Sequence, residues 1–426
     1  MWARLRTEFS TANQGSVAII FAFALIALLG IAALAIDFGR YYSVRTKLGQ
    51  ALDRSALAGA KLMVEDGATD EQVRERTRAF FETQANLLGI PVASGVTLNI
   101  DVQRATNTIG VVATLPLPTT LARVIGINQL DIRQKAEASF RISRIEVAFA
   151  LDLTGSMAAL IPGESVTRLQ ALQASTRSIV DTLFDLAPND AAVRIALAPY
   201  SAAVNAGSYA TTVTGNAPWE NNCVVERLGS ENATDAPPTG ANRLRAVTGS
   251  LLNPPWTDCP LVPVRPLSGR NNRTAIHNAI SAFGPIGATA GHIGTAWGWY
   301  LVSHRWASMF PTANRPSEPG SDVVKNVIVM TDGEFNVAYL NGAATGNPQE
   351  REDSYTQFRN LCTNMRNDSI NVYTIAFGLI SGGRAETELQ DCATTPSNFF
   401  STANSAELQA AFARIADRIT QLRLSK

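Results

Sequence analysis

The strongest hydrophobic feature of the chain is an uninterrupted apolar run at residues 16–36, which reads SVAIIFAFALIALLGIAALAI. A helix needs roughly 20 apolar residues to cross the hydrocarbon core of a bilayer, and this uncharged run meets that requirement. Asp37 and Arg40 end the run, and two tyrosines follow where aromatic side chains favour the membrane interface. We therefore expect a transmembrane helix at 16–36, preceded by a short N-terminal tail at 1–15.

Beyond residue 36 the apolar positions become periodic instead of continuous. From Tyr41 to Met63 they recur at steps of three and four residues, which predicts that the membrane helix continues with one apolar face to about Val64. A second helix is predicted at 71–88. Residues 37–90 are therefore expected to form a helical stalk.

Between Val96 and Ile142 the pattern changes to the alternation of apolar and polar residues that is typical of antiparallel strands, with the last strand expected at Ala136–Ile142. Pro116 and Pro118 lack the backbone N–H that a strand donates, so we interpret them as strand breakers. Residues 91–143 are expected to form a small β-rich spacer.

From residue 144 onward short apolar runs alternate with helical patterns. This alternation predicts an α/β fold, with a doubly wound, mostly parallel sheet covered by helices on both faces. The predicted strands are Ile145–Leu151, Val193–Ala198, Asn326–Met330 and Asn371–Phe377. The predicted helices are Thr167–Leu186, Arg273–Phe283, Gly294–Ser303, Gln349–Asn367 and Ser405–Leu422.

One part of this domain, which is expected at 144–426, departs from the alternation. Residues 205–270 are rich in Asn, Pro, Gly and Thr and are too long to be an ordinary loop. We interpret them as an insertion, which is either a surface module that sets partner specificity or a decoration without such a role.

Charge narrows the possible partners. The chain has 36 basic and 36 acidic residues, so its formal net charge is zero, and the two signs are interleaved. A nucleic-acid-binding protein carries a basic patch or stripe, so we do not expect nucleic acid as a partner.

The four cysteines form no CxxC pair, which disfavours a zinc cluster or a redox motif. Disulfides are the preferred interpretation, and of the three possible pairings we favour the two that are local in sequence, Cys223 with Cys259 and Cys362 with Cys392. Four reduced, buried thiols are the alternative.

The orientation of the membrane helix receives conflicting signals. Arg40, Arg45, Lys47 and Arg54 outnumber the two N-terminal arginines, which by the positive-inside rule favours a cytoplasmic C-terminal domain. Disulfides favour an oxidising compartment instead, and large domains translocate with little regard to charge, so we expect an extracytoplasmic domain.

A cleaved secretory signal would also start with an apolar run. The run at 16–36 is longer than the apolar region of a typical signal peptide, and no A-x-A site is followed by a change in character. We therefore expect a retained membrane anchor.

Oxygen-bearing side chains follow three of the apolar runs, at the edge where folds of this class bind ligands. Asp152, Thr154 and Ser156 stand at alternate positions after the first predicted strand of the domain, Thr289 precedes a predicted helix, and Asp332 follows a third apolar run. Carboxylates and hydroxyls are ligands for hard cations such as Mg²⁺.

These motifs, DLTGSM at 152–157, the single Thr289 and TDGE at 331–334, resemble the metal-ion-dependent adhesion site (MIDAS) of von Willebrand factor A (vWA) domains. The family writes its first motif as DxSxS, and Thr154 keeps the hydroxyl of the serine that it replaces. The resemblance implies hydroxyl ligands from Thr154, Ser156 and Thr289, with Asp152 and Asp332 binding directly or through water. It also implies Mg²⁺ as the ion, with Mn²⁺ or Ca²⁺ as alternatives, and a protein partner that presents an acidic residue.

A second resemblance covers nearly the whole chain. The segments GSVAIIFAFAL, IDFGR, GTAWGWYLVS and AFARIADRITQLRLSK are similar to those of TadG-type proteins, which are membrane-anchored components of the bacterial tight-adherence (Flp) pilus assembly machinery. The resemblance implies a single-pass protein of the inner membrane with its large C-terminal domain in the periplasm, and other Tad pilus components as partners. The related pseudopilins are processed where Glu follows Gly by five residues; Ile20 stands at that position after Gly15, which favours a retained anchor.

An enzyme is the main rival class, but the chain contains no GxSxG, GxxxxGK[ST], HExxH or GxGxxG motif. His292 lies near the proposed site, although an isolated histidine is more often a surface or core residue. The aromatic cluster at 297–306 has helical spacing, so we interpret it as packing and not as a ligand-stacking platform. We expect a non-enzymatic pilus assembly or adhesion component; a metal-independent structural scaffold and a metal-dependent hydrolase are the alternatives.

Overall fold

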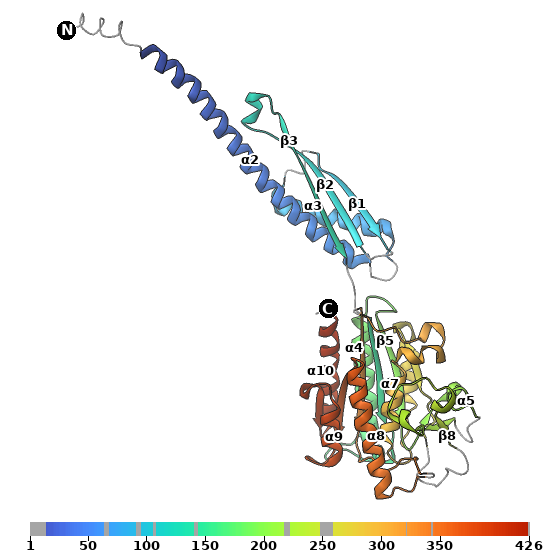
Figure 1. Cartoon of the computed structure of the whole chain (residues 1–426). Helices are drawn as coiled ribbons and strands as arrows, with labels where there is room; N and C mark the ends of the chain where they lie inside the picture. The colour runs from blue at the N-terminus through green and yellow to red at the C-terminus, as the bar shows by residue number, and fades with distance from the viewer. Residues whose placement is uncertain are drawn as a thin grey trace, which may run out of the picture. The chain divides into compact units, whose positions relative to one another are not determined.

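The computed structural model describes residues 14–63, 68–90, 95–104, 108–139, 144–216, 222–247, 259–320, 322–341 and 344–424. The chain divides into two compact units, residues 1–141 and residues 142–426. The first unit contains the apolar run and a small sheet, and the second contains the α/β fold (Figure 1).

The apolar run and the periodic segment after it form one helix, α2 (Gln14–Met63). From residue 18 to Ile36 nearly every described side chain is exposed, whereas beyond Asp37 one face of the helix becomes buried. Among the described residues, α2 is the one helix that is long and apolar enough to cross a membrane. The exposed part is the segment predicted to lie in the bilayer.

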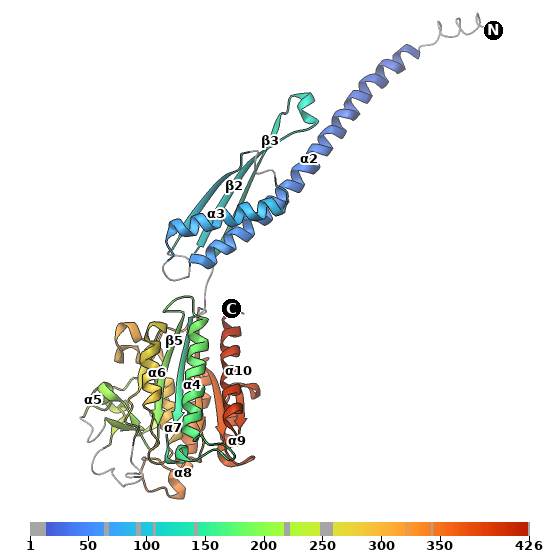
Figure 2. The same ribbon diagram turned by 180° about the vertical axis from the view of Figure 1, so that it is seen from behind.

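The buried face of α2 packs in the first unit against α3 (Asp70–Leu87) and a three-stranded antiparallel sheet, which lie beside it in both views (Figure 1, Figure 2). The strands are β1 (Thr97–Gln103), β2 (Thr108–Pro118) and β3 (Gln129–Ser139), in the order β1-β2-β3. Stalk and spacer, which were predicted as separate segments, share one core. It includes Leu48, Leu52, Val73, Phe81, Val111, Leu115 and Ile132.

The prediction that Pro116 breaks the strand is wrong, because β2 runs through this residue; the strand does end at Pro118. β1 pairs with β2 only as far as Thr114, so the end of β2 has a neighbour on one side only, the β3 side. Such an edge is where a strand tolerates proline. β3 begins seven positions before the predicted Ala136 and is described to Ser139; the predicted continuation to Ile142 lies outside the described residues.

In the second unit nine strands of the described residues form one sheet, in the order β12-β11-β10-β4-β5-β6-β7-β8, with β9 also paired to β5. The five strands β12-β11-β10-β4-β5 are each parallel to their neighbours. β6 and β9 pair antiparallel with β5, β7 with β6, and β8 with β7. The fold class predicted from the sequence is confirmed. The strands are β4 (Arg144–Asp152), β5 (Val193–Tyr200), β6 (Val204–Asn205), β7 (Cys223–Val225), β8 (Arg245–Ala246), β9 (Arg265–Ser268), β10 (Val323–Thr331), β11 (Asn371–Phe377) and β12 (Phe399–Thr402).

Helices cover both faces of the sheet. Alternate residues of β4 face opposite layers: Val147 and Phe149 pack with α4, α6 and α10, whereas Ala148 and Ala150 face the layer that contains α7, α8 and α9. This alternation is the period-two geometry of a strand buried on both faces. The helices are α4 (Arg168–Asp185), α5 (Ala210–Thr214), α6 (Arg273–Ser281), α7 (Gly291–Tyr300), α8 (Pro348–Asn367), α9 (Arg384–Cys392) and α10 (Ser405–Leu424).

Helix α7 begins three residues earlier than predicted and ends three residues earlier, because tertiary packing decides its position. A side chain at Gly294 would overlap the ring of Tyr200 on β5, and one at Gly298 would come within 3.1 Å of Val327 and 3.3 Å of Ala150. The glycines therefore let α7 lie close to the sheet, although they are poor helix formers.

The insertion contributes β6, β7, β8 and β9 to one side of the sheet, and none of these strands was predicted from the sequence. Cys223 on β7 is bonded to Cys259, and Cys362 on α8 is bonded to Cys392 on α9, with Cα–Cα distances of 5.9 and 5.1 Å. These are the two pairings that the sequence favoured.

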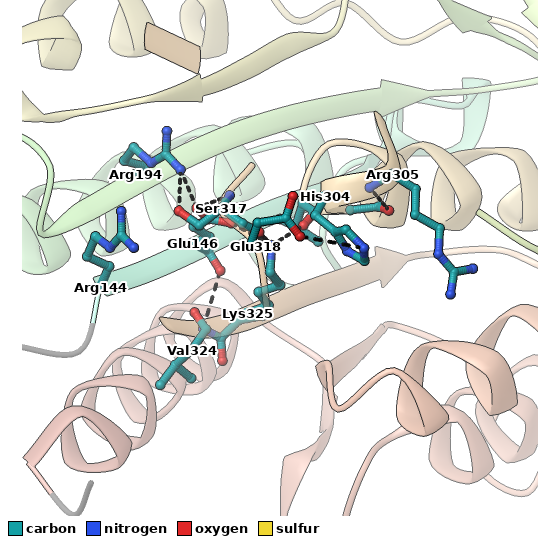
Figure 3. Close-up of polar contacts among 12 residues, drawn as sticks. Arg144, Glu146, Arg194, His304, Arg305, Ser317, Glu318, Val324 and Lys325 are labelled. Atoms are coloured by element: carbon teal, nitrogen blue, oxygen red, sulfur yellow. Dashed lines mark hydrogen bonds and ion pairs between the residues drawn. The ribbon is translucent and has the colours of Figure 1, made fainter. Parts of the chain in front are cut away.

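A buried ion cluster lies at the amino end of β4 (Figure 3). Glu146, which has no solvent exposure, accepts a hydrogen bond at 3.0 Å from Nζ of Lys325 and one from Arg194, and the backbone N–H of Ser317 also donates to it at 2.9 Å. Burial alone would raise the pKa of Glu146, but the two cations and these hydrogen bonds outweigh it and lower the pKa.

Burial lowers the pKa of Lys325, the opposite of what an ion pair does to a lysine. Its Nζ nevertheless donates to Glu146, to the carbonyl of Val302 at 2.6 Å and to that of Ser317 at 2.7 Å. Three acceptors match the three N–H groups of an ammonium, so we assign the charged form. Through these hydrogen bonds the cluster connects Val302 and Ser317 to the amino ends of β4 and β10.

Candidate functional site

The carboxyl end of β4 turns sharply and brings Asp152, Thr154 and Ser156 together. Asp152 is fully buried, and its Oδ1 accepts a hydrogen bond from the backbone N–H of Thr154 at 2.8 Å. A 3₁₀ turn at Gly155–Ala158 then returns Ser156 toward Thr154, and their hydroxyl oxygens are 2.9 Å apart. The DxTxS spacing thus places three oxygen-bearing side chains on one loop.

Strand β10, which is next to β4, supplies Asp332 to the same place. The hydroxyl of Ser156 donates to Oδ1 of Asp332 at 2.6 Å. The hydroxyl of Thr331, the last residue of β10, donates to Oδ2 of Asp152 at 2.5 Å. Hydrogen bonds therefore join two loops that are far apart in the sequence but end adjacent parallel strands.

Thr289, the fifth predicted residue, lies in the loop before α7 and is buried. Its backbone N–H donates to Oδ1 of Asn336 at 2.8 Å, and its carbonyl accepts from the N–H of Asn336 at 3.0 Å. A Cβ at Gly333 would lie 3.6 Å from Oγ1 of Thr289 and 3.7 Å from Oγ of Ser156. The two hydroxyls therefore flank Gly333, and the structure brings all five predicted residues to one edge of the sheet.

Arg168 is a member of this site that the sequence analysis missed. It is the first residue of α4, and its Nη1 donates to Oδ2 of Asp332 at 2.8 Å and more distantly to the carbonyl of the same residue at 3.4 Å. Asp332 is fully buried in this ion pair, whereas the Arg168 side chain is 20% exposed. A basic residue in the first turn opposes the helix dipole, and this was the signal available in the sequence.

The site contains more buried carboxyl groups than cationic side chains. Burial first, and then the neighbouring charge of Asp332, raise the pKa of Asp152 to about 7. Burial and the same carboxylates also raise the pKa of Tyr200, which donates to the carbonyl of Met330 at 3.1 Å. The site therefore holds two buried carboxyl groups, and the guanidinium of Arg168 contacts that of Asp332.

The donor set suits a hard cation. Among the described residues no three His, Cys, Asp or Glu side chains come together as metal ligands. A cation here would have to take the hydroxyl oxygens of Thr154, Ser156 and Thr289 with the two aspartates, and all five donors are oxygens, as Mg²⁺ prefers.

His292 is on α7 but does not join the site. Its Nδ1 lies 2.7 Å from Oγ of Ser354, and its Nε2 lies 3.7 Å from Oε2 of Glu226. The aromatic residues at 297–306 are core residues: Trp297, Trp299, Tyr300 and Trp306 are almost completely buried. We conclude that these residues pack the domain and do not bind an external ligand.

Residues 15–62 match a sequence family described as putative Flp pilus-assembly TadE/G-like. The match covers most of α2, so it concerns the membrane helix and its continuation, and not the α/β unit. None of the curated proteins matches the chain.

Solved structures with a similar arrangement include vWA domains and pilus proteins. The pilus adhesin SpaC from Lactobacillus rhamnosus GG is 11% identical with a TM-score of 0.38, over 76% of this chain and 34% of SpaC, so the chain spans about a third of that adhesin. The vWF domain of the type V pili tip protein Mfa5 from Porphyromonas gingivalis is 15% identical with a TM-score of 0.42, over 66% of this chain and 97% of that domain. Proximal thread matrix protein 1 from the mussel byssus, with a zinc-occupied MIDAS motif, is 14% identical with a TM-score of 0.34, over 85% and 58% of the two chains.

Proposed function

We propose that this chain is a membrane-anchored component of Flp/Tad pilus assembly or adhesion, which binds a protein partner through a Mg²⁺-dependent adhesion site. One observation carries the proposal: three hydroxyls and two carboxylates from three separate loops converge at the carboxyl edge of the sheet. Convergence of side chains that are unrelated in sequence, at the edge where such folds bind ligands, favours a built site over a chance cluster.

In this proposal the three hydroxyls and the two aspartates hold the ion, which supplies an electrophilic contact for an acidic side chain of the partner. Ser156 has a central part, because its hydroxyl lies within hydrogen-bond distance of both Thr154 and Asp332. Mn²⁺ or Ca²⁺ could take the same oxygens. The raised pKa of Asp152 is consistent with this role, since a cation would offset the repulsion between the two carboxylates.

The ion pair between Arg168 and Asp332 favours a second candidate, a metal-independent structural scaffold. A guanidinium already compensates one of the two carboxylates at 2.8 Å. If that compensation suffices, the domain needs no ion and binds its partner by shape and hydrogen bonding alone.

The pilus assignment rests on the family match to residues 15–62. It makes other Tad pilus components the expected partners and the bacterial inner membrane the expected location. The two disulfides support a periplasmic C-terminal domain, because such bonds persist in oxidising compartments.

We propose binding and not catalysis as the activity. The triplet Ser354, His292 and Glu226 has the residue types of a hydrolase, but Ser354 is fully buried and His292 is 1% exposed. A nucleophile inside the core is out of reach of a substrate, so we interpret the triplet as buried polar residues that join α7 to α8 and to the segment after β7.

Thermal unfolding of residues 142–426 with Mg²⁺ and with EDTA tests the proposal, because an ion that binds only the folded state stabilises it by mass action. At an ion concentration of about 100 times Kd the gain is about 2.7 kcal/mol. The matched variant is Asp152→Asn, which keeps the side-chain shape while the rotatable Thr331 hydroxyl can accept from the new amide. We expect Mg²⁺ to raise the midpoint of the wild type and not of the variant; no rise for either would favour the metal-independent scaffold.

A further inference from the structure

The turn between β2 and β3 is apolar, unlike most surface connections, which are rich in Gly, Asn, Asp and Ser. It contains the 3₁₀ helix η2 (Ala122–Ile125), in which Val124 and Ile125 are 84% and 55% exposed. Leu121 and Ile127 are each 38% exposed. A single exposed apolar residue is ordinary, but a cluster of four in one turn indicates a surface that something apolar covers.

Asp37 fixes this turn to the helix that carries the apolar run. Its buried carboxylate accepts hydrogen bonds from the backbone N–H groups of residues 120–122 at 2.9, 2.8 and 2.6 Å. Arg40, one helical turn later, donates to the carbonyl of Pro118 and the hydroxyl of Thr120, both at 3.1 Å. Asp37 and Arg40, the two charged residues of the IDFGR segment, therefore hold the turn at the level where the apolar run ends.

The turn also reaches along the membrane side of Asp37. η2 contacts α2, and in both views the end of the hairpin points along α2 toward its apolar N-terminal part (Figure 1, Figure 2). In the otherwise exposed run, Gly30, Ala33 and Leu34 are half-buried. Because a helix rises 1.5 Å per residue, Leu34 and Ala33 lie about 4.5–6 Å from the level of Asp37. Interfacial apolar segments reach about 5–10 Å into the boundary between headgroups and acyl chains.

The side chains around the turn suit the headgroup region. Phe38 and Tyr42 are exposed on α2 and stand edge-to-face against Tyr41, and aromatic rings concentrate at membrane interfaces. Arg123 is exposed within η2, where its long stem lets the guanidinium reach lipid phosphates while its neighbours stay in the apolar layer.

We propose that the β2–β3 turn inserts into the membrane interface beside α2, so that the first unit is attached to the bilayer at two points. The occupant of the apolar surface is lipid, because the surface is continuous with the exposed apolar helix and is held at its boundary by Asp37. The inference requires α2 to span the membrane, and it is independent of the metal site.

Fluorescence of the full chain in phosphatidylethanolamine/phosphatidylglycerol vesicles tests this. The four native cysteines are paired in disulfides, so Val124→Cys provides one reactive thiol for an environment-sensitive dye such as NBD. The control is Leu87→Cys, an apolar position of the same unit that is 74% exposed. Arg54 donates to Gln84 at 2.9 Å, so this end of α3 lies beside residue 54 of α2, about 25 Å from Asp37 along the helix.

We expect the dye at residue 124 to emit at shorter wavelength than the dye at residue 87, and to lose emission when lipids carry a nitroxide near the glycerol backbone. Equal emission at the two positions would overturn the proposal. A second outcome would also overturn it. If the dye at residue 124 is blue-shifted in nanodiscs that hold one chain each, but lipid nitroxides do not quench it, protein and not lipid covers the turn.

Asp37→Asn in the Val124→Cys background tests how the turn is held. Loss of the carboxylate weakens three hydrogen bonds, so the dye should shift toward the emission of the residue-87 control. Circular dichroism checks that the unit remains folded, and Arg40→Gln provides a second variant that leaves Asp37 in place. Unchanged lipid quenching in both variants would contradict the role of the IDFGR segment.

Discussion

Arg168 on α4 and Asp332 after β10 form an ion pair of 2.8 Å across the candidate site, although the two residues are 164 positions apart in the sequence. Asp332 has no exposed side-chain surface, so the guanidinium is its principal counter-charge when no ion is bound. If the proposed ion binds here, the ion and the Arg168 guanidinium would compete for the carboxylate of Asp332.

Arg168→Gln should therefore lower the stability of the domain without Mg²⁺ and increase the stability that it gains from Mg²⁺, relative to the wild type. In EDTA we expect a loss of about 3 kcal/mol in the free energy of unfolding, because a buried carboxylate is left without its cation. In Mg²⁺ we expect a larger gain than in the wild type, since the ion no longer competes with the guanidinium. Urea denaturation with and without Mg²⁺ measures both effects; equal gains in the two proteins would show that Arg168 does not compete.

Glu146→Gln should destabilise the second unit by about 3–5 kcal/mol, because Lys325 and Arg194 would face each other without the carboxylate that both contact. Glu318→Gln is the matched control, as that side chain is 82% exposed and pairs with His304 only at 3.9 Å. The control should stay within about 0.5 kcal/mol of the wild type, as surface changes usually do. Urea denaturation at pH 7 compares the three proteins.

The effect of Glu146 should also depend on pH. The pKa of this carboxyl is lowered in the folded state, so its stabilising contribution is present above its usual value of 4.5 and is lost as the pH falls through the lowered folded value. We expect the stability difference between wild type and Glu146→Gln to stay constant from pH 7 to about 5 and to shrink at lower pH. A difference that grows on acidification would contradict the assigned direction.

Gly294→Ala should destabilise the second unit, although alanine in an exposed helix normally gains about 1 kcal/mol over glycine. The new methyl group would overlap the ring of Tyr200, and such overpacking costs about 1–3 kcal/mol. Gly298→Ala should cost less, because its nearest neighbours lie at 3.1 and 3.3 Å and can yield. Thermal unfolding ranks the two; a stabilised Gly294→Ala protein would mean that α7 is not held against β5.

The cysteines should be fully oxidised in the native membrane. If the second unit is periplasmic, denaturation without reductant should leave no thiol reactive toward maleimide. Cys362→Ala with Cys392→Ala should lower the free energy of unfolding by about 3–4 kcal/mol in the chain-entropy estimate, because the bond closes a loop of 30 residues. Four reactive thiols would place the unit in a reducing compartment.

Buried strands and long amphipathic helices were predictable because their signals are local. Asn371–Phe377 is strand β11 residue for residue, and α4 begins directly after the predicted Thr167, whose side chain caps it. The short strands of the insertion and β12 were not predicted, since strands of two to four residues show too little periodicity, and helix α9 was not predicted either.

In the candidate site, too, the residues next to strong local signals were predictable and the others were not. Asp152 and Asp332 follow strong apolar runs, so their meeting at one edge followed from the parallel sheet. Arg168 was missed because a helix terminus has no periodicity, and its contact depends on how α4 packs. In the first unit the apolar face at 41–63 indicated burial, but nothing in the sequence identified the small sheet as what covers it.

Helix α2 continues without interruption from the apolar run into the core of the first unit, over 50 residues and about 75 Å. The chain therefore has no hinge at the membrane surface. A lateral force on the first unit is transmitted through α2 to its apolar segment. Such a force must either tilt the helix in the bilayer or bend it. A continuous helix of this kind transmits torque between the first unit and the membrane-spanning segment.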